Sequence, residues 1–338
     1  LDWDAEASTY RVRADGSGLD QLGFEEARDA APLIAAGDLS ADRRWRVSTV
    51  SGDIYLVDRQ TMQTRRLTHT EDSEGQPMFS ADGASVIFRR GSNLFRIGIE
   101  DGELEQITRI SSNPAPSDEA EAEGQKGFLE QQQLELFEHI RRDAEGRERS
   151  EERRAAAAAD EPETVHLGRN ERVQGLTPTR NGAFVLLRAG TAAQGTTRTI
   201  VPDWVTADGY TRDINTRTKV GDVQGSSRAG ILATAKGEVT WIDVAPDDYE
   251  SDDAPRVFNA AWNDAGTMAF IFAVSSDNKD RWLWSVDATG SDRTLLDHLH
   301  NEAWVSGPCF GGCVGFLPGT DRIYFVSEES NYAQLYAV

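Results

Sequence analysis

The sequence repeats itself at an interval of forty residues, and this constrains the fold more than any other feature. Ser40-Ala41-Asp42 recurs as Ser80-Ala81-Asp82, and Asp53-Ile54-Tyr55 corresponds to Asn93-Leu94-Phe95 at the same interval. A period of about 40–45 residues with several short strands per unit is typical of propeller blades.

The residues within each repeat favour strands. The runs are short and rich in Val, Ile, Phe and Tyr, and Gly, Asp and Asn interrupt them. A repeat of helix pairs would instead need apolar residues three or four positions apart. Further copies occur at 176–189, 231–244, 260–296 and 316–338. We therefore predict an all-β chain, a β-propeller of four-stranded blades.

The prediction is about six blades in this chain, as part of a seven- or eight-bladed propeller. The first copy, at 10–16, is partial, and the last ends at Val338 in the third strand of its blade. An unfinished blade leaves an open sheet edge. We therefore expect the sequence to be a fragment of a longer protein.

Residues 111–164 interrupt the repeat and divide the chain into three parts: propeller blades at 1–110, this insertion, and propeller blades at 165–338. The insertion begins as an acidic loop. It continues as a charged helix of roughly seven to nine turns, because Glu and Arg alternate, an alanine run follows, and Pro162 ends it. Two interpretations stay open: a docking or dimer arm, and a solvated excursion that lies on the propeller.

Charge and composition exclude several classes of function. The formal charge of −22 argues against nucleic-acid partners, which need basic patches. No apolar run approaches 18 residues, so no membrane span is expected.

The two cysteines, Cys309 and Cys313, lie four positions apart. They can form a local disulfide over the Gly-Gly loop in an oxidising compartment, or remain as two free thiols. A metal site would need more Cys or His at ligand spacing nearby, so we expect no metal and no cofactor.

No catalytic machinery can be assigned to this chain. The Gly-x-Ser-x-Gly pattern of hydrolases is absent, no Ser-His-Asp set can be nominated, and no phosphate-binding Gly loop occurs. The expected function is therefore to bind or to gate, through the loops at one end of a central channel.

Several of these stretches resemble the N-terminal propeller of the prolyl oligopeptidase family of serine peptidases, and the dipeptidyl peptidase IV-like branch in particular. The stretches that carry the resemblance are GDIYLVDRQTMQTRRLT (52–68), GQPMFSADGASVIFRRGSNLFRI (75–97), VPDWVTADGYTRDINTRTKVGD (201–222), EAWVSGP (302–308) and IYFVSEESNYAQLYAV (323–338). The resemblance covers nearly all of the chain apart from the helical insertion.

The resemblance implies a two-domain serine exopeptidase or oligopeptidase, periplasmic or secreted, whose propeller gates peptide access. Its C-terminal α/β-hydrolase domain would carry the Ser, Asp and His, and it is missing from this chain. The loop at 304–310 resembles a substrate-facing stretch of the family, so Trp304 and Phe310 are candidate contacts of a peptide substrate. A homodimer is a further option. The alternative is a stand-alone periplasmic propeller of the TolB type, a scaffold that binds proteins.

Overall fold

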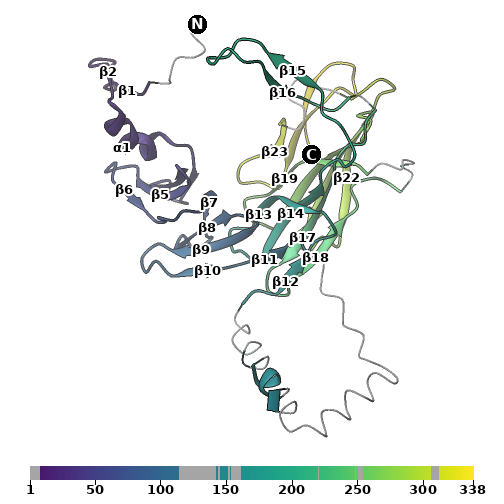
Figure 1. Ribbon diagram of the computed structural model, residues 1–338, viewed down its shortest axis with the longest axis horizontal. Helices are drawn as coiled ribbons and strands as arrows, with labels where there is room; N and C mark the ends of the chain where they lie inside the picture. The colour runs from purple at the N-terminus through teal and green to yellow at the C-terminus, as the bar shows by residue number, and fades with distance from the viewer. Residues whose placement is uncertain are drawn as a thin grey trace.

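The chain folds into small antiparallel sheets that follow one another along the molecule (Figure 1). The computed structural model describes residues 8–113, 142–143, 145–150, 153, 161–219, 221–247, 249, 254–305 and 312–338. Four of the sheets have four strands and one has three. This confirms the expected all-β architecture of four-stranded blades.

The five sheets, blades 1 to 5, follow each other in chain order. Blade 1 contains β3 (Asp38–Leu39), β4 (Trp45–Val50), β5 (Asp53–Asp58) and β6 (Thr64–Arg66), and blade 2 contains β7 (Glu74–Phe79), β8 (Ser85–Arg90), β9 (Asn93–Gly98) and β10 (Leu104–Gln106). Blade 3 contains β13 (Arg172–Pro178), β14 (Phe184–Thr191), β17 (Ser226–Ala233) and β18 (Glu238–Ile242). Blade 4 contains β19 (Arg256–Trp262), β20 (Met268–Val274), β21 (Asp280–Asp287) and β22 (Arg293–His300), and blade 5 contains β23 (Val314–Phe316), β24 (Ile323–Ser327) and β25 (Gln334–Ala337).

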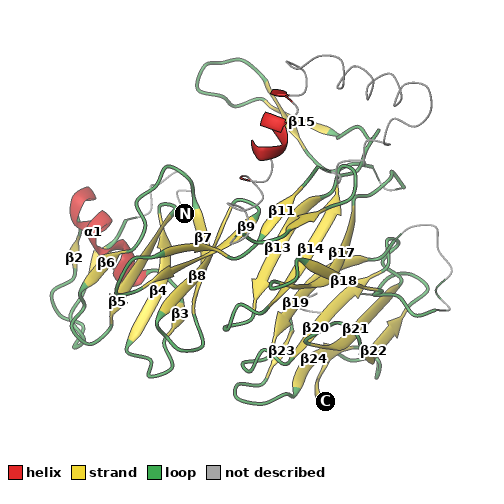
Figure 2. Cartoon of the chain, turned by 90° about the horizontal axis from the view of Figure 1, so that it is seen from below, coloured by secondary structure: helices red, strands yellow, loops and turns green. Residues whose placement is uncertain are grey.

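The central strands carry continuous apolar runs because both of their faces are buried, and alternate residues point to opposite neighbours. In β8, Val86 and Phe88 belong to the core between blades 1 and 2, whereas Ile87 belongs to the core between blades 2 and 3. In β20, Phe270 faces blade 5 and Ile271 faces blade 3. Four such cores join the five blades face to face, as the side-by-side sheets in Figure 2 suggest.

The repeated Ser-x-Asp turn links the first two strands of a blade. In blade 2, the Ser80 hydroxyl donates to Asp82 Oδ1 at 2.5 Å, and the Ala84 N–H donates to the same carboxylate at 3.0 Å. The hydrogen bond from the Ser80 hydroxyl lowers the pKa of Asp82 most, and the hydrogen bond from the Ala84 N–H lowers it further. Gly83 follows in the left-handed region at φ 69°. The forty-residue signal is therefore a turn whose side chains satisfy their own backbone.

Smaller elements lie between the blades. They are the hairpin β1 (Tyr10–Arg11) and β2 (Asp20–Gln21), the helix α1 (Phe24–Ile34), the parallel pair β11 (Arg109–Ser111) and β12 (Thr164–His166), and the hairpin β15 (Ile200–Asp203) and β16 (Arg212–Asn215). The last hairpin is inserted between β14 and β17 and extends from blade 3 (Figure 1).

Helix α1 was not expected from the repeat. Its sequence contains three Ala and two Glu among its 11 residues, and both are good helix formers. At its start, the Gly23 N–H donates to Glu26 Oε2 at 3.2 Å. The helix contacts blade 1, where Arg46 donates to the carbonyl oxygens of Pro32 and Leu33 at 3.1 and 2.5 Å.

The charged insertion begins and ends at neighbouring strands, because β11 and β12 pair directly. Within it, residues 142–143, 145–150 and 153 are helical. Residues 114–141, 144, 151–152 and 154–160 lie outside the described residues, so the predicted length of the helix and the boundaries of the three parts stay predictions. None of the helices that the structure describes is long and apolar enough to cross a membrane.

Candidate functional site

One end of the blade arrangement is held together by contacts between turns of successive blades. We use the name turn row for these turns together with the strand residues Asp38 and Phe79; its members are Asp38, Phe79–Ala81, Thr179–Gly182, Asn263–Gly266 and Gly319–Asp321. The Ala81 N–H donates to the Arg180 carbonyl at 2.9 Å, which joins blade 2 to blade 3. The Gly319 N–H donates to Asp264 Oδ2 at 2.9 Å, which joins blade 5 to blade 4.

Asp38 and Arg180 form the longest-range contact of the turn row, which we call the clasp. The Arg180 guanidinium donates two hydrogen bonds to the Asp38 carboxylate, at 2.8 and 2.9 Å. It also donates to the Phe79 carbonyl at 3.2 Å, and the Phe79 N–H donates to Asp38 at 2.9 Å. The hydrogen bond to Asp38 raises the pKa of Arg180. The clasp thus ties blades 1, 2 and 3 at one point through charge-assisted bidentate bonds.

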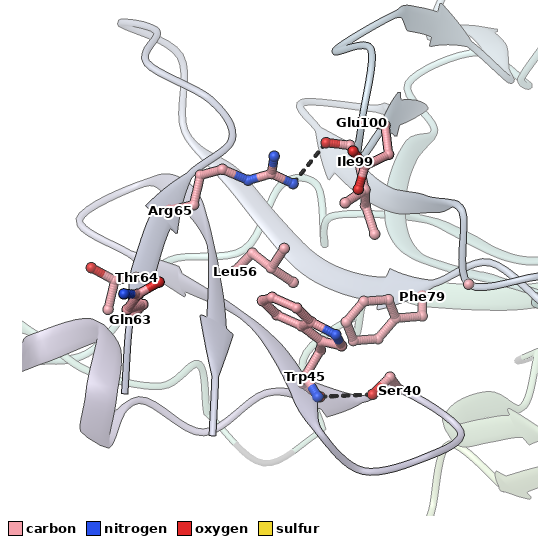
Figure 3. Close-up of a pocket in the computed structure, with 10 residues that line it drawn as sticks. Ser40, Trp45, Leu56, Gln63, Thr64, Arg65, Phe79, Ile99 and Glu100 are labelled. Carbon is pink, nitrogen blue, oxygen red and sulfur yellow. Dashed lines mark hydrogen bonds between the residues drawn. The ribbon is translucent and has the colours of Figure 1, made fainter. Parts of the chain in front are cut away.

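A cavity of about 540 Å³ lies between blades 1 and 2 (Figure 3). Its apolar wall consists of Trp45, Leu56, Phe79 and Ile99. Arg65 reaches across its opening and donates to the Ile99 carbonyl at 2.7 Å. The space suits an apolar or aromatic group, with polar side chains at the rim.

Ser40 lines the same cavity but is not poised as a nucleophile. Its hydroxyl donates to Asp42 Oδ1 at 2.6 Å and accepts from the Trp45 N–H at 2.9 Å, so it is committed to the turn. An activated serine would instead face a general base such as histidine. The cavity can therefore bind but offers no chemistry through this residue.

The structure places one of the two predicted substrate contacts. Trp304 lies in the loop after β22 with 67% of its surface exposed. Its backbone N–H donates to Asn301 Oδ1 at 3.3 Å. The next residue anchors the loop, because the Val305 N–H donates to the Asn278 carbonyl at 2.7 Å. Phe310 lies outside the described residues, so a joint role of Trp304 and Phe310 stays a prediction.

The two options for Cys309 and Cys313, a local disulfide or two free thiols, also stay open. Cys313 is described and directly precedes β23, whereas Cys309 lies outside the described residues.

Near the Trp304 loop, two histidines share one carboxylate, a feature that sequence reasoning missed. His298 Nε2 and His300 Nδ1 lie 2.9 and 2.8 Å from Asp280 Oδ1. The hydrogen bond to Asp280 raises the pKa of His300. The His-x-His spacing on a strand was the available signal, but its partner depends on the register that sets Asp280 opposite His300. In the described part of the chain, no serine hydroxyl joins this group, and no cluster of three or more side chains arranged to hold a metal ion is found.

Comparison with known proteins gives a likeness of fold. No protein-family model and no curated protein matches the chain. Among solved structures, the chain is similar to dipeptidyl peptidase 4 of Porphyromonas gingivalis, with a TM-score of 0.51, 14% identity, and coverage of 96% of this chain and 41% of that one. The resemblance to propellers of the dipeptidyl peptidase IV-like branch is thus confirmed for the fold.

Two other solved structures give lower scores. A dipeptidyl aminopeptidase IV, described as putative, from Bacteroides ovatus has a TM-score of 0.47 at 13% identity, with 97% of this chain and 40% of that one covered. TolB from Acinetobacter baumannii has a TM-score of 0.35 at 14% identity, with 86% of this chain and 47% of that one covered. The chain spans less than half the length of each of these structures.

Proposed function

We propose that this chain is the non-catalytic propeller region of a serine exopeptidase or oligopeptidase, and that it gates the access of peptides to an α/β-hydrolase domain outside this sequence. The observation that carries the proposal is the likeness to dipeptidyl peptidase 4, which involves 96% of this chain but only 41% of that protein. In the proposal, the hydrolase domain supplies the nucleophile, and the protein is periplasmic or secreted and can pair with a second copy.

The turn row supports a gating role. Charge-assisted and backbone hydrogen bonds fix the turns of consecutive blades against each other at one end of the arrangement. A mouth with fixed turns admits short or unstructured peptides and rejects folded proteins, because widening it would break several of these bonds together. Apolar side chains of an admitted peptide can contact the cavity between blades 1 and 2 and the exposed Trp304.

The test compares this chain with the complete gene product on chromogenic Xaa-Pro and Xaa-Ala dipeptides and on a reduced, unfolded protein. We expect no turnover by residues 1–338 and turnover by the complete product that a serine-directed inhibitor abolishes. Arg180→Gln, which breaks the clasp, should raise kcat/KM for the same protein in its folded form several-fold and leave the dipeptide rates unchanged.

The matched control is Arg212→Gln, which removes the same charge from an exposed ion pair with Asp208 on the β15–β16 hairpin. It should change neither rate. Hydrolysis by residues 1–338 alone would contradict the proposal, as would a complete product that lacks peptidase activity and binds a protein partner. The latter result would favour the scaffold of the TolB type.

A further inference from the structure

A second cavity, of about 350 Å³, lies between blades 3 and 4, away from the turn row. The only charged side chains of its described lining are Arg188 and Arg256. Two cations in one small cavity are unexpected in a chain whose formal charge is −22. Neither arginine forms an ion pair with a carboxylate of the residues that the structure describes, although carboxylates outnumber basic side chains 57 to 35 in the sequence.

Arg188 is held in place by neutral groups. Its Nη1 donates to the carbonyl oxygens of Val257 and Phe258 at 3.4 and 3.0 Å, across the junction of the two blades. Burial lowers the pKa of this guanidinium, in contrast to Arg180, whose carboxylate partner raises it. The charge of Arg188 is therefore oriented and partly desolvated, and no carboxylate of the described residues compensates it.

Arg256 is also held by neutral groups. Its Nη2 donates to the Asn278 amide oxygen at 2.5 Å, and its guanidinium lies 5.5 Å from the centre of the Phe258 ring. Its Nε is buried without a hydrogen-bond partner in the described residues. A guanidinium has five N–H donors; Asn278 takes one donor of Arg256 and the Nε–H is buried, so the other Nη N–H groups remain for a ligand.

The hydroxyl groups of the cavity add further donors. Ser227 Oγ accepts from the Val257 N–H at 2.8 Å, so its own proton is left to donate. Thr191 Oγ1 and Ser226 Oγ lie 2.9 Å apart, and only one of their two protons is needed for that hydrogen bond. The polar lining thus offers N–H and O–H donors around a positively charged space.

The local backbone makes room for the arginines. β13 and β19 each have an irregular register, at Val173/Gly175 and at Val257/Asn259. Gly175 faces Arg188, and a Cβ at this position would lie 3.1 Å from Arg188 Nε. Bulges of this kind are frequent where a strand positions a side chain for binding.

We propose that the cavity between blades 3 and 4 binds the oxyanion group of a small ligand, a carboxylate or a phosphate, between Arg188 and Arg256. Planar guanidinium groups match the geometry of both oxyanions, and the flanking hydroxyls complete the set of donors. This binding function is independent of the proposed peptidase gate, because it concerns different residues and needs no catalytic domain.

The test is isothermal titration of the purified protein with inorganic phosphate in one arm and acetylglycine, a peptide-like carboxylate, in the other, at constant ionic strength in chloride. We expect saturable binding of one equivalent in at least one arm. The arm that shows binding identifies whether the cavity takes a phosphate or a carboxylate. Arg188→Gln and Arg256→Gln should each weaken it by roughly tenfold or more, since each removes charge-assisted hydrogen bonds. Arg109→Gln, which removes an equal charge from an exposed pair with Glu161, should not weaken it.

A second measurement needs no variant. The anion that binds should protect Arg188 and Arg256 of the wild-type protein from modification by phenylglyoxal, as read by peptide mass spectrometry. Absence of saturable binding in both arms would overturn the inference, and so would equal weakening in all three variants or equal modification with and without the anion.

Discussion

Replacing Arg281 with methionine is expected to destabilise the chain by about 3–5 kcal/mol. Arg281 and Asp297 form an ion pair at 2.7 Å whose side chains are only 5% and 9% exposed. Arg281 also donates to the Val326 carbonyl at 3.0 Å, which joins blade 4 to blade 5. Its removal leaves a buried, uncompensated carboxylate, which costs far more than the loss of a surface pair. Chemical unfolding followed by fluorescence measures the change.

The double variant Arg281→Met/Asp297→Leu tests whether the loss of stability comes from the buried carboxylate that Arg281→Met leaves unpaired. It should recover most of the lost stability, because two apolar side chains replace two desolvated charges. Arg28→Met, which removes an exposed arginine paired with Glu25, should change the free energy of unfolding by less than about 0.5 kcal/mol. A loss below about 1 kcal/mol for Arg281→Met would show that the pair is not buried as described.

Replacing Trp282 with alanine is expected to cost a similar amount, about 3–5 kcal/mol. Trp282 is 1% exposed and belongs to the core between blades 3 and 4. The Tyr249 ring meets it edge-on with 4.9 Å between the ring centroids. Because the blades pack face to face, the lost side chain leaves a cavity that neither rigid sheet can fill.

The control for Trp282→Ala is Trp204→Ala, because Trp204 is 76% exposed, beyond the end of β15. Guanidinium unfolding should show no loss of stability for this variant. Equal effects of the two substitutions would mean that Trp282 does not lie between two blades.

The blades could be predicted from the sequence because their signals are local. Ser80 and Asp82 form their turn within six residues, and the continuous apolar runs of β8 and β20 indicate burial on both faces. The sequence predicts two separate copies of the repeat at 176–189 and 231–244, whereas the structure joins both stretches in one sheet, blade 3. Helix α1 was missed because it lies outside the repeat that guided the prediction.

The candidate sites depend on contacts that no local pattern encodes. Asp38 and Arg180 are separated by 142 positions, and only the order of the blades in space brings them together. Among the residues that the structure describes, Arg188 and Arg256 have no acidic partner, and this is likewise a property of three-dimensional packing rather than of sequence spacing. Trp304 is a candidate through the family resemblance alone, and its side chain is exposed in the structure.

The central claim is that consecutive blades stand side by side so that the turns of blades 1, 2 and 3 meet at one end. The most direct measurement is zero-length carbodiimide cross-linking of the Arg180→Lys variant, read by mass spectrometry. The chain has only four lysines of its own, at 126, 219, 236 and 279, so the background is low.

The account predicts an isopeptide bond between Lys at position 180 and Asp38, because the native side chains are in contact at 2.8 Å. The Arg172→Lys variant places the amine at the exposed start of β13 and should give no such product. Cross-links from position 180 to other carboxylates but not to Asp38, or equal yields from both variants, would contradict the arrangement of the blades.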